Sequence, residues 1–148
     1  MRINALAQRI IPPLWCGVVC GIALEARLKF LAPGITRELG LGIGKIVFTA
    51  INRVECVLAI LLAAALWLGV SRATPRFIFG LVALVLLLQT FWLVPELVQR
   101  VDLIVAGQPP PPAPLHIFYI VAEGIKVLLL LTLSVLIQWR ETSKPEMI

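Results

Sequence analysis

Four long apolar runs dominate this sequence, and each is about long enough to cross a lipid bilayer. A transmembrane helix needs about 20 mainly apolar residues, whereas an average soluble domain has about 25% charged residues. Here 60% of the 148 residues are hydrophobic and 14% are charged. The sequence therefore predicts an integral membrane protein in which four spans and short connections leave no room for a separate soluble catalytic domain.

Prolines and polar residues mark the ends of the predicted spans. Pro12 and Pro13 fit the opening turn of the first helix. Thr74 is the expected N-cap of the third helix, with Pro75 at its first position. Residues 107–112 (GQPPPP) are expected to form a stiff polyproline II spacer before the fourth helix. We predict an all-α, up-down bundle of four transmembrane helices in a single domain, residues 1–148, with spans at about 10–31, 44–70, 75–100 and 114–139.

The basic residues indicate how the chain is oriented. The net charge of +5 is attributed to contacts with anionic lipid headgroups, not to nucleic-acid binding. An even number of spans places both termini on one side, and that side has more Lys and Arg if Arg27 and Lys29 belong to the bundle. By the positive-inside rule, both termini are then expected in the cytoplasm, with the helices in the cytoplasmic (inner) membrane. Trp15, Trp67 and Trp139 are expected to form an aromatic belt on the same side.

The N-terminal segment has the charge pattern of a signal peptide, because Arg2 and Arg9 precede an apolar run. The small residues of a cleavage site do not come after that run. We therefore expect an uncleaved first helix.

Ionisable and amide side chains enter every predicted span, and they do so from the same end. These residues are Glu25, Asn52, Arg53, Glu55, Glu96, Arg100, Glu123 and Lys126. Up-down topology would bring all of them into one half of the bilayer. An unpaired charge near the bilayer centre costs about 2.5–3.5 kcal/mol on insertion scales. We therefore expect these side chains to face one another in an intramembrane polar network.

Helical spacing places most of these groups on common faces. Polar residues recur every three or four positions on the third and fourth spans: Gln89, Trp92, Glu96 and Arg100, and His116, Tyr119, Glu123 and Lys126. Glu25 and Lys29 form an i,i+4 pair on the first span. Arg53 is about 160° from Glu55 around the second helix, so that helix must meet polar partners on two sides. Pro95 predicts a kink beside the network.

Three interpretations of the network remain open. It is a buried salt-bridge network that fixes helix register, a proton or ion relay or polar substrate pocket, or a contact with a partner subunit. Intramembrane ionisable residues are functional candidates by default.

Small and sulfur-containing residues of the first two spans have two possible roles. Gly17 and Gly21 form a G-x3-G pattern, which predicts close helix packing within the bundle or in a dimer. Cys16, Cys20 and Cys56 are sulfur ligands of the kind that Cu(I) prefers, but cysteine also serves as a small apolar residue in cores. We predict no metal site and no cofactor.

No pattern in the sequence indicates an enzyme. His116 is the single histidine, which excludes a three-histidine metal site within one chain. Residues 40–45 (GLGIGK) contain glycines before a lysine, but they do not fit the frame of a phosphate-binding loop. A nucleophile with a neighbouring base is not evident either, so a non-enzymatic role is expected.

Two segments carry a resemblance to a known family. They are KFLAPGITRELGLGIGKIVFTAINRVE at residues 29–55 and RVDLIVAGQPPPPAPLHIFYIVAEGIKVLLLL at residues 100–131. The first segment contains an apolar helix, a loop and then a helix with the polar or charged residues Asn52, Arg53 and Glu55. In this order of features the chain resembles small four-span membrane proteins of the DUF4149 or transmembrane-protein-205-like group. The resemblance covers most of the chain and implies a four-helix transmembrane bundle. It implies no particular activity and assigns no functional residue.

Two functions are compatible with these features. The first is a non-enzymatic accessory or assembly subunit of a larger membrane complex, whose partners are membrane lipids and other membrane subunits or a second copy of the chain. The alternative is a small transporter or channel component. Its polar path would consist of Arg53, Glu55, Glu96, Glu123 and Lys126.

Overall fold

The computed structural model describes residues 2–69 and 73–142, which form helices joined by short loops. The helices are α1 (Arg2–Leu28), the 3-10 turn η1 (Lys29–Leu31), α2 (Arg37–Leu68), α3 (Ala73–Leu88), the π-helical η2 (Gln89–Leu93), α4 (Val94–Val105) and α5 (Leu115–Thr142). The described residues include no β-strand. The predicted all-helical class is therefore confirmed.

Three helices among the described residues are long and apolar enough to cross a membrane. They are Arg37–Leu68, the continuous rod Ala73–Val105 formed by α3, η2 and α4, and Leu115–Trp139 within α5. The helix α1 is not one of these three, although it has 27 residues.

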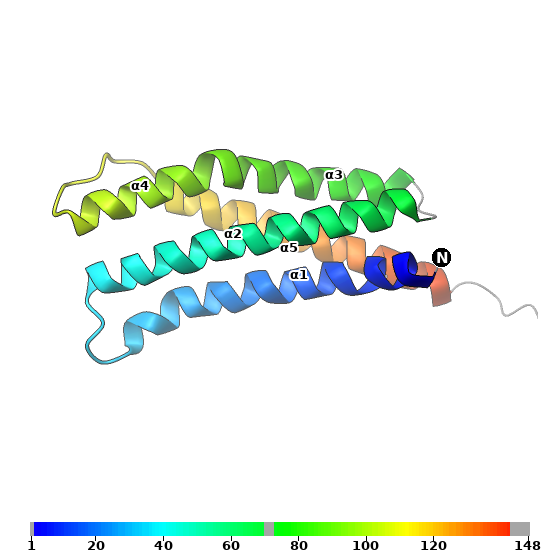
Figure 1. The fold of residues 1–148 in the computed structure, drawn as a ribbon, viewed down its shortest axis with the longest axis horizontal. Coiled ribbons are helices and arrows are strands. Elements are labelled where there is room, and N and C mark those ends of the chain that lie inside the picture. Colours follow the sequence, from blue (N-terminus) through cyan, green and yellow to red (C-terminus); the bar gives the residue numbers. More distant parts are fainter. Residues whose placement is uncertain (1, 70–72, 143–148) are drawn as a thin grey trace, which may run out of the picture.

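The helices lie side by side, and the α1–α2 connection lies at the same end of the molecule as the α4–α5 connection (Figure 1). Helix α1 packs against α2 and α5, and the α3–α4 rod also packs against both α2 and α5. The largest apolar core lies between these helices and includes the fully buried side chains Trp15, Leu62, Leu66, Leu130 and Leu133. The interior is therefore built from one inward stripe of each helix.

Helix α1 begins earlier than predicted. It starts at Arg2 instead of near residue 10, so Pro12 and Pro13 lie inside the helix and not in its opening turn. Each proline lacks a backbone N–H and therefore donates no hydrogen bond within the helix. The Gln8 side chain also joins α1 to α2, because its Nε2 donates to the carbonyl of Ala65 at 2.6 Å.

Helix α2 also begins earlier than predicted, at Arg37 instead of residue 44. Thr36 caps it: the Thr36 Oγ1 accepts a hydrogen bond from the backbone N–H of Leu39 at 3.2 Å. The acidic Glu38 in the first turn adds a favourable interaction with the helix dipole. The glycine-rich residues 40–44 are therefore helical.

The third predicted span begins at Ala73, so Thr74 lies inside the helix and is not its N-cap. The distortion expected from Pro95 is present as the π-helical turn η2, just before this proline. The Val94 N–H bonds to the carbonyl of Gln89, five residues back. The rod changes direction at this turn (Figure 1), as is common at prolines and π-bulges.

Candidate functional site

A cluster of buried polar side chains surrounds Lys126 inside the bundle. The Lys126 Nζ lies 2.5 Å from Glu55 Oε1, 2.8 Å from Gln89 Oε1 and 3.1 Å from Glu123 Oε1. The Lys126 and Glu55 side chains are 0% and 1% exposed, and that of Glu123 is 18% exposed. A lysine ammonium has three donors and no acceptor. The three acceptors around Nζ therefore match a protonated Lys126.

Two further donors complete the cluster. Trp15 Nε1 donates to Glu55 Oε1 at 2.8 Å, and Gln89 Nε2 donates to Glu123 Oε1 at 3.0 Å. The buried side chains thus come from α1, α2, η2 and α5. The second oxygen of each carboxyl group, Glu55 Oε2 and Glu123 Oε2, is buried without a hydrogen-bond partner.

Helical periodicity explains why these polar groups point inward. Lys126 lies on the same face of α5 as the buried Leu130 and Leu133. Glu55 lies on the face of α2 that buries Leu58 and Leu62. Each polar residue of the pair occupies a position in an otherwise apolar inward stripe, so packing of the stripes brings the charges together.

Asn52 lies one turn before Glu55 and makes a separate contact. Its Nδ2 donates to Thr90 Oγ1 at 3.0 Å, and Cys56 Sγ lies 3.8 Å from the same hydroxyl. Thr90 belongs to η2. This contact therefore joins α2 to the π-helical turn beside the cluster.

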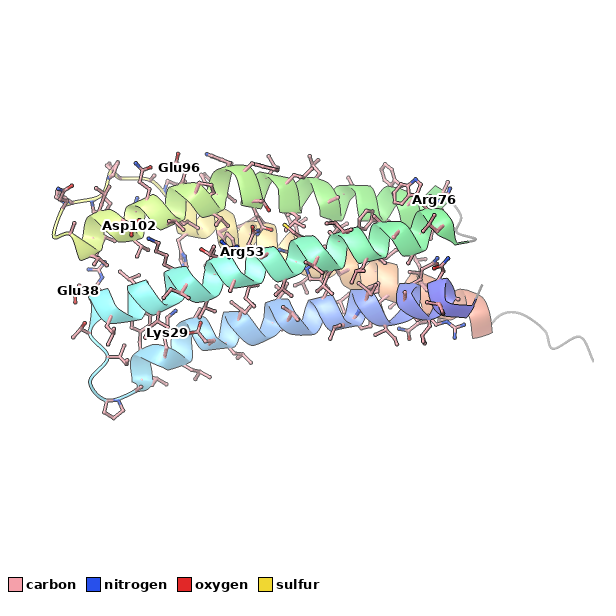
Figure 2. The ribbon with its side chains drawn as sticks, in the orientation of Figure 1. Lys29, Glu38, Arg53, Arg76, Glu96 and Asp102 are labelled. Carbon is pink, nitrogen blue, oxygen red and sulfur yellow. The ribbon has the colours of Figure 1, made fainter. Side chains whose placement is uncertain are left out.

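Five of the eight predicted network residues lie outside the cluster around Lys126, and two of these five are exposed. Arg53 is exposed on α2, and Glu96 is exposed on α4 (Figure 2). Arg53 is exposed because it lies about 160° around α2 from Glu55. The face of α2 that carries Glu55 points into the bundle, so the face that carries Arg53 points outward. For Glu96 the reason is η2: in a regular helix Gln89 and Glu96 would be about 20° apart, but a π-bulge adds a residue and rotates the rest of the helix by about 100°.

The remaining predicted charges form local contacts toward the loops. Lys29 Nζ lies 3.5 Å from Glu25 within the first helical segment. Arg100 donates from its NH1 group to the carbonyl of Pro111 at 2.6 Å, which fastens the proline-rich connection. The expected single network is therefore divided into the cluster around Lys126 and separate contacts.

Sequence reasoning missed several residues of these contacts. Lys45 and Asp102 form an ion pair of 2.5 Å between α2 and α4. Trp15 is expected in the interfacial belt, but its side chain is fully buried against Glu55, whereas Trp67 and Trp139 are exposed. The signal for Trp15 is its spacing of four from Val19 and Ile11, which are also buried.

The small-residue pattern on α1 does not pack within the chain. Gly17 and Gly21 are exposed, and a Cβ atom at either position would meet nothing within 4 Å. The stripe containing these two glycines faces outward because α1 turns Trp15 and Val19 toward the core. The expectation of close packing within the bundle is therefore wrong, and close packing in a dimer stays a prediction.

The three cysteines do not converge on one site. Cys16 contacts the carbonyl of Val127 at 3.6 Å, Cys20 is exposed, and Cys56 lies beside Thr90. Over residues 2–69 and 73–142, His, Cys, Asp and Glu form no group of three or more that could hold a metal ion. His116 is exposed.

Comparison with known proteins gives no relative. No family model matches the chain, and neither a curated protein nor a solved structure is significantly similar to it. The resemblance to the DUF4149 or transmembrane-protein-205-like group therefore stays a prediction.

Proposed function

We propose that this chain is an integral membrane protein of four spans in up-down order, and that it serves as a non-enzymatic accessory or assembly subunit of a larger membrane complex. The observation that carries the proposal is the position of Arg53. Its side chain is exposed near the middle of α2, which runs from Arg37 to Leu68.

The face of α2 that contains Arg53 is otherwise apolar. Its exposed residues recur at helical spacing before and after the arginine: Ile46, Ala50, Val57 and Ile60. Arg53 lies eight residues beyond Lys45, which is about 12 Å along the helix. Residues 56–71 contain no charged side chain. A membrane around α2 would therefore place this guanidinium within the hydrocarbon layer.

An arginine facing lipid at this depth costs about 2.5–3.5 kcal/mol on insertion scales. Arg53 has no hydrogen bond or ion pair with another described residue. A second membrane protein with an Asp or Glu side chain at the same depth removes this cost by forming a charge-assisted pair. The exposed Glu96 on α4 would in the same way need a Lys or Arg side chain from a partner.

The shape of α1 supports its inclusion as the fourth span. Its 27 residues correspond to about 40 Å of helix, enough to cross the hydrocarbon core. Large apolar side chains on its outer side, including Leu14, Leu24 and Leu28, are more than half exposed. Such a surface is suited to lipid.

We also propose that the helices lie in the cytoplasmic (inner) membrane with both termini in the cytoplasm. The positive-inside rule favours this orientation if Lys29 belongs to the bundle and not to the loop. The Lys29 side chain is 13% exposed and pairs with Glu25, which supports this assignment. Arg27, the other residue on which the count of charges depends, has a side chain outside the described part of the structure.

Purification from native membranes in a mild detergent tests the proposal. We expect the chain in a larger assembly with at least one other membrane protein at a fixed ratio. The Arg53→Leu variant should lose this partner, whereas Arg37→Leu should retain it, because Arg37 carries the same charge at the exposed start of α2. A wild-type chain that purifies alone and monodisperse would contradict the proposal.

A small transporter or channel component is a second candidate function. The observation that favours it is the cluster around Lys126, which holds two buried carboxyl oxygens without partners. Liposomes containing the purified chain would be assayed for proton or ion flux, with Glu123→Gln as the variant. Flux that is undiminished in this variant would remove Glu123 from the path.

A further inference from the structure

We infer that Glu55 and Glu123 together hold one exchangeable proton, which makes the cluster a proton-binding site inside the bundle. The charges and donors of the cluster itself carry this inference. A shared proton is compatible with an accessory subunit and with a transporter, so its test is independent of the proposed function.

Lys126 supplies one positive charge to the cluster. Its Nζ has three oxygen neighbours at 2.5–3.1 Å, on Glu55, Gln89 and Glu123. Three acceptors use all three protons of an ammonium group. Lys126 is therefore protonated in this arrangement.

The cluster contains more acid than base. Two ionised carboxylates beside one ammonium would leave a net negative charge in the interior, where the penalty is several kcal/mol per ion. The other polar groups that face the pair are neutral: Trp15 from α1, Gln89 from η2 and Tyr119 from α5. Arg53 points out of the bundle and cannot neutralise the pair.

The donors of the cluster are unevenly distributed over the carboxyl oxygens. The contacts from Trp15 and Lys126 to Glu55 and those from Gln89 and Lys126 to Glu123 all involve an Oε1 atom. The Tyr119 hydroxyl also lies near the Glu123 carboxyl group. Both Oε2 atoms are buried without a partner. A proton on either Oε2 cancels the excess negative charge of the cluster, so that the buried pair carries one negative charge beside one ammonium group. Interacting carboxyl groups share such a proton as a pair.

The two carboxyl groups differ in their access to the surroundings. The Glu55 side chain is 1% exposed, whereas the Glu123 side chain is 18% exposed. Glu123 is therefore the member of the pair through which the proton enters and leaves. When the proton moves from one carboxyl group to the other, one O–H bond breaks and another forms, and no other covalent bond changes.

Infrared spectroscopy of the purified full chain in lipid vesicles at neutral pH tests the inference, because a protonated carboxyl group has a C=O band distinct from that of a carboxylate. We expect such a band in the wild type and a shift of this band after transfer into D₂O. Glu55→Gln and Glu123→Gln should each abolish it, since one carboxylate then balances one ammonium. Glu38→Gln is the matched control and should retain the band, because Glu38 is exposed at the start of α2.

The wild-type spectrum alone can overturn the inference, even if a variant fails to fold. Absence of a protonated carboxyl band would show that both acids are ionised. A band that appears only after removal of sodium would identify a metal cation in place of the proton. A band that survives in both glutamine variants would belong to another group, and a band insensitive to D₂O would exclude exchange.

Discussion

Lys126 of α5 and Glu55 of α2 form an ion pair across the interior, with 2.5 Å between Nζ and Oε1 and at most 1% of either side chain exposed. Helices α2 and α5 each pack against α1 and against the α3–α4 rod. The pair therefore joins two helices through the centre of the bundle. Its geometry links the relative register of α2 and α5 to this buried contact, in addition to the apolar core that both helices share.

Removal of the lysine should destabilise the fold strongly. Lys126→Met leaves Glu55 and Glu123 buried without their shared cation, and breaking a buried ion pair costs about 3–5 kcal/mol. We expect a matching loss in the free energy of unfolding, measured by reversible denaturation in detergent micelles. The double variant Lys126→Met with Glu55→Gln should recover part of this loss. Equal stability of Lys126→Met and wild type would show that the pair does not hold the helices together.

Trp15 should contribute through its indole N–H as well as through its size. Trp15→Phe keeps an aromatic ring but removes the donor to Glu55 Oε1, and hydrogen bonds to charged groups contribute about 1.5–3 kcal/mol. We expect a decrease in unfolding free energy of at least that size in the same assay. Trp92→Phe is the control, since Trp92 is half exposed and should change little. A similar effect of both substitutions would argue against a specific role of the indole donor.

The ion pair between Lys45 and Asp102 should matter much less than the buried pair. Its side chains are 33% and 57% exposed, and exposed ion pairs contribute about 0–1 kcal/mol. Lys45→Ala should therefore lower stability by no more than that, and added salt should reduce the difference. A loss of stability as large as that of Lys126→Met, and insensitive to salt, would contradict the claim that the buried Lys126 pair stabilises the fold more than the exposed Lys45 pair does.

The glycines of α1 should be dispensable for the fold of the single chain. An alanine at Gly17 or Gly21 would meet no neighbour within 4 Å, and alanine is favoured over glycine in a helix interior by roughly 0.5–1 kcal/mol. Gly17→Ala and Gly21→Ala should leave the unfolding free energy unchanged or raise it. A clear loss of stability in purified single chains would mean that this face packs within the bundle after all.

The long apolar runs predicted the helical class. The position of the ionisable residues at one end of the spans, and the cost of leaving them unpaired in a membrane, predicted the meeting of Glu55, Glu123 and Lys126. The same reasoning failed for Glu96, since the π-helical turn at Gln89–Leu93 rotates the residues that come after it. Assigning residues to helix faces at about 100° per residue assumes a regular α-helix without the extra residue of a π-helical turn. A proline at position 95 indicated a distortion there, but not its direction or its effect on register.

The predicted starts of helices α1 and α2 also lie too late in the chain. Hydropathy marks where a span becomes apolar, whereas α2 begins seven residues earlier at a Thr36 cap. The enrichment of tryptophan at membrane interfaces favours an interfacial Trp15, although its spacing from Val19 indicates the core. In both cases local packing and capping outweighed the general preference.

Photocross-linking in native membranes tests the central claim most directly, because it leaves Arg53 intact. A photoreactive residue would replace Ala50 or Val57, which flank Arg53 on the exposed face of α2, and Leu128 on the exposed face of α5 would serve as the control. We predict a discrete adduct with another membrane protein from positions 50 and 57 and none from position 128. Adducts with lipid alone, or the same products from all three positions, would contradict the claim that this face of α2 binds a partner subunit.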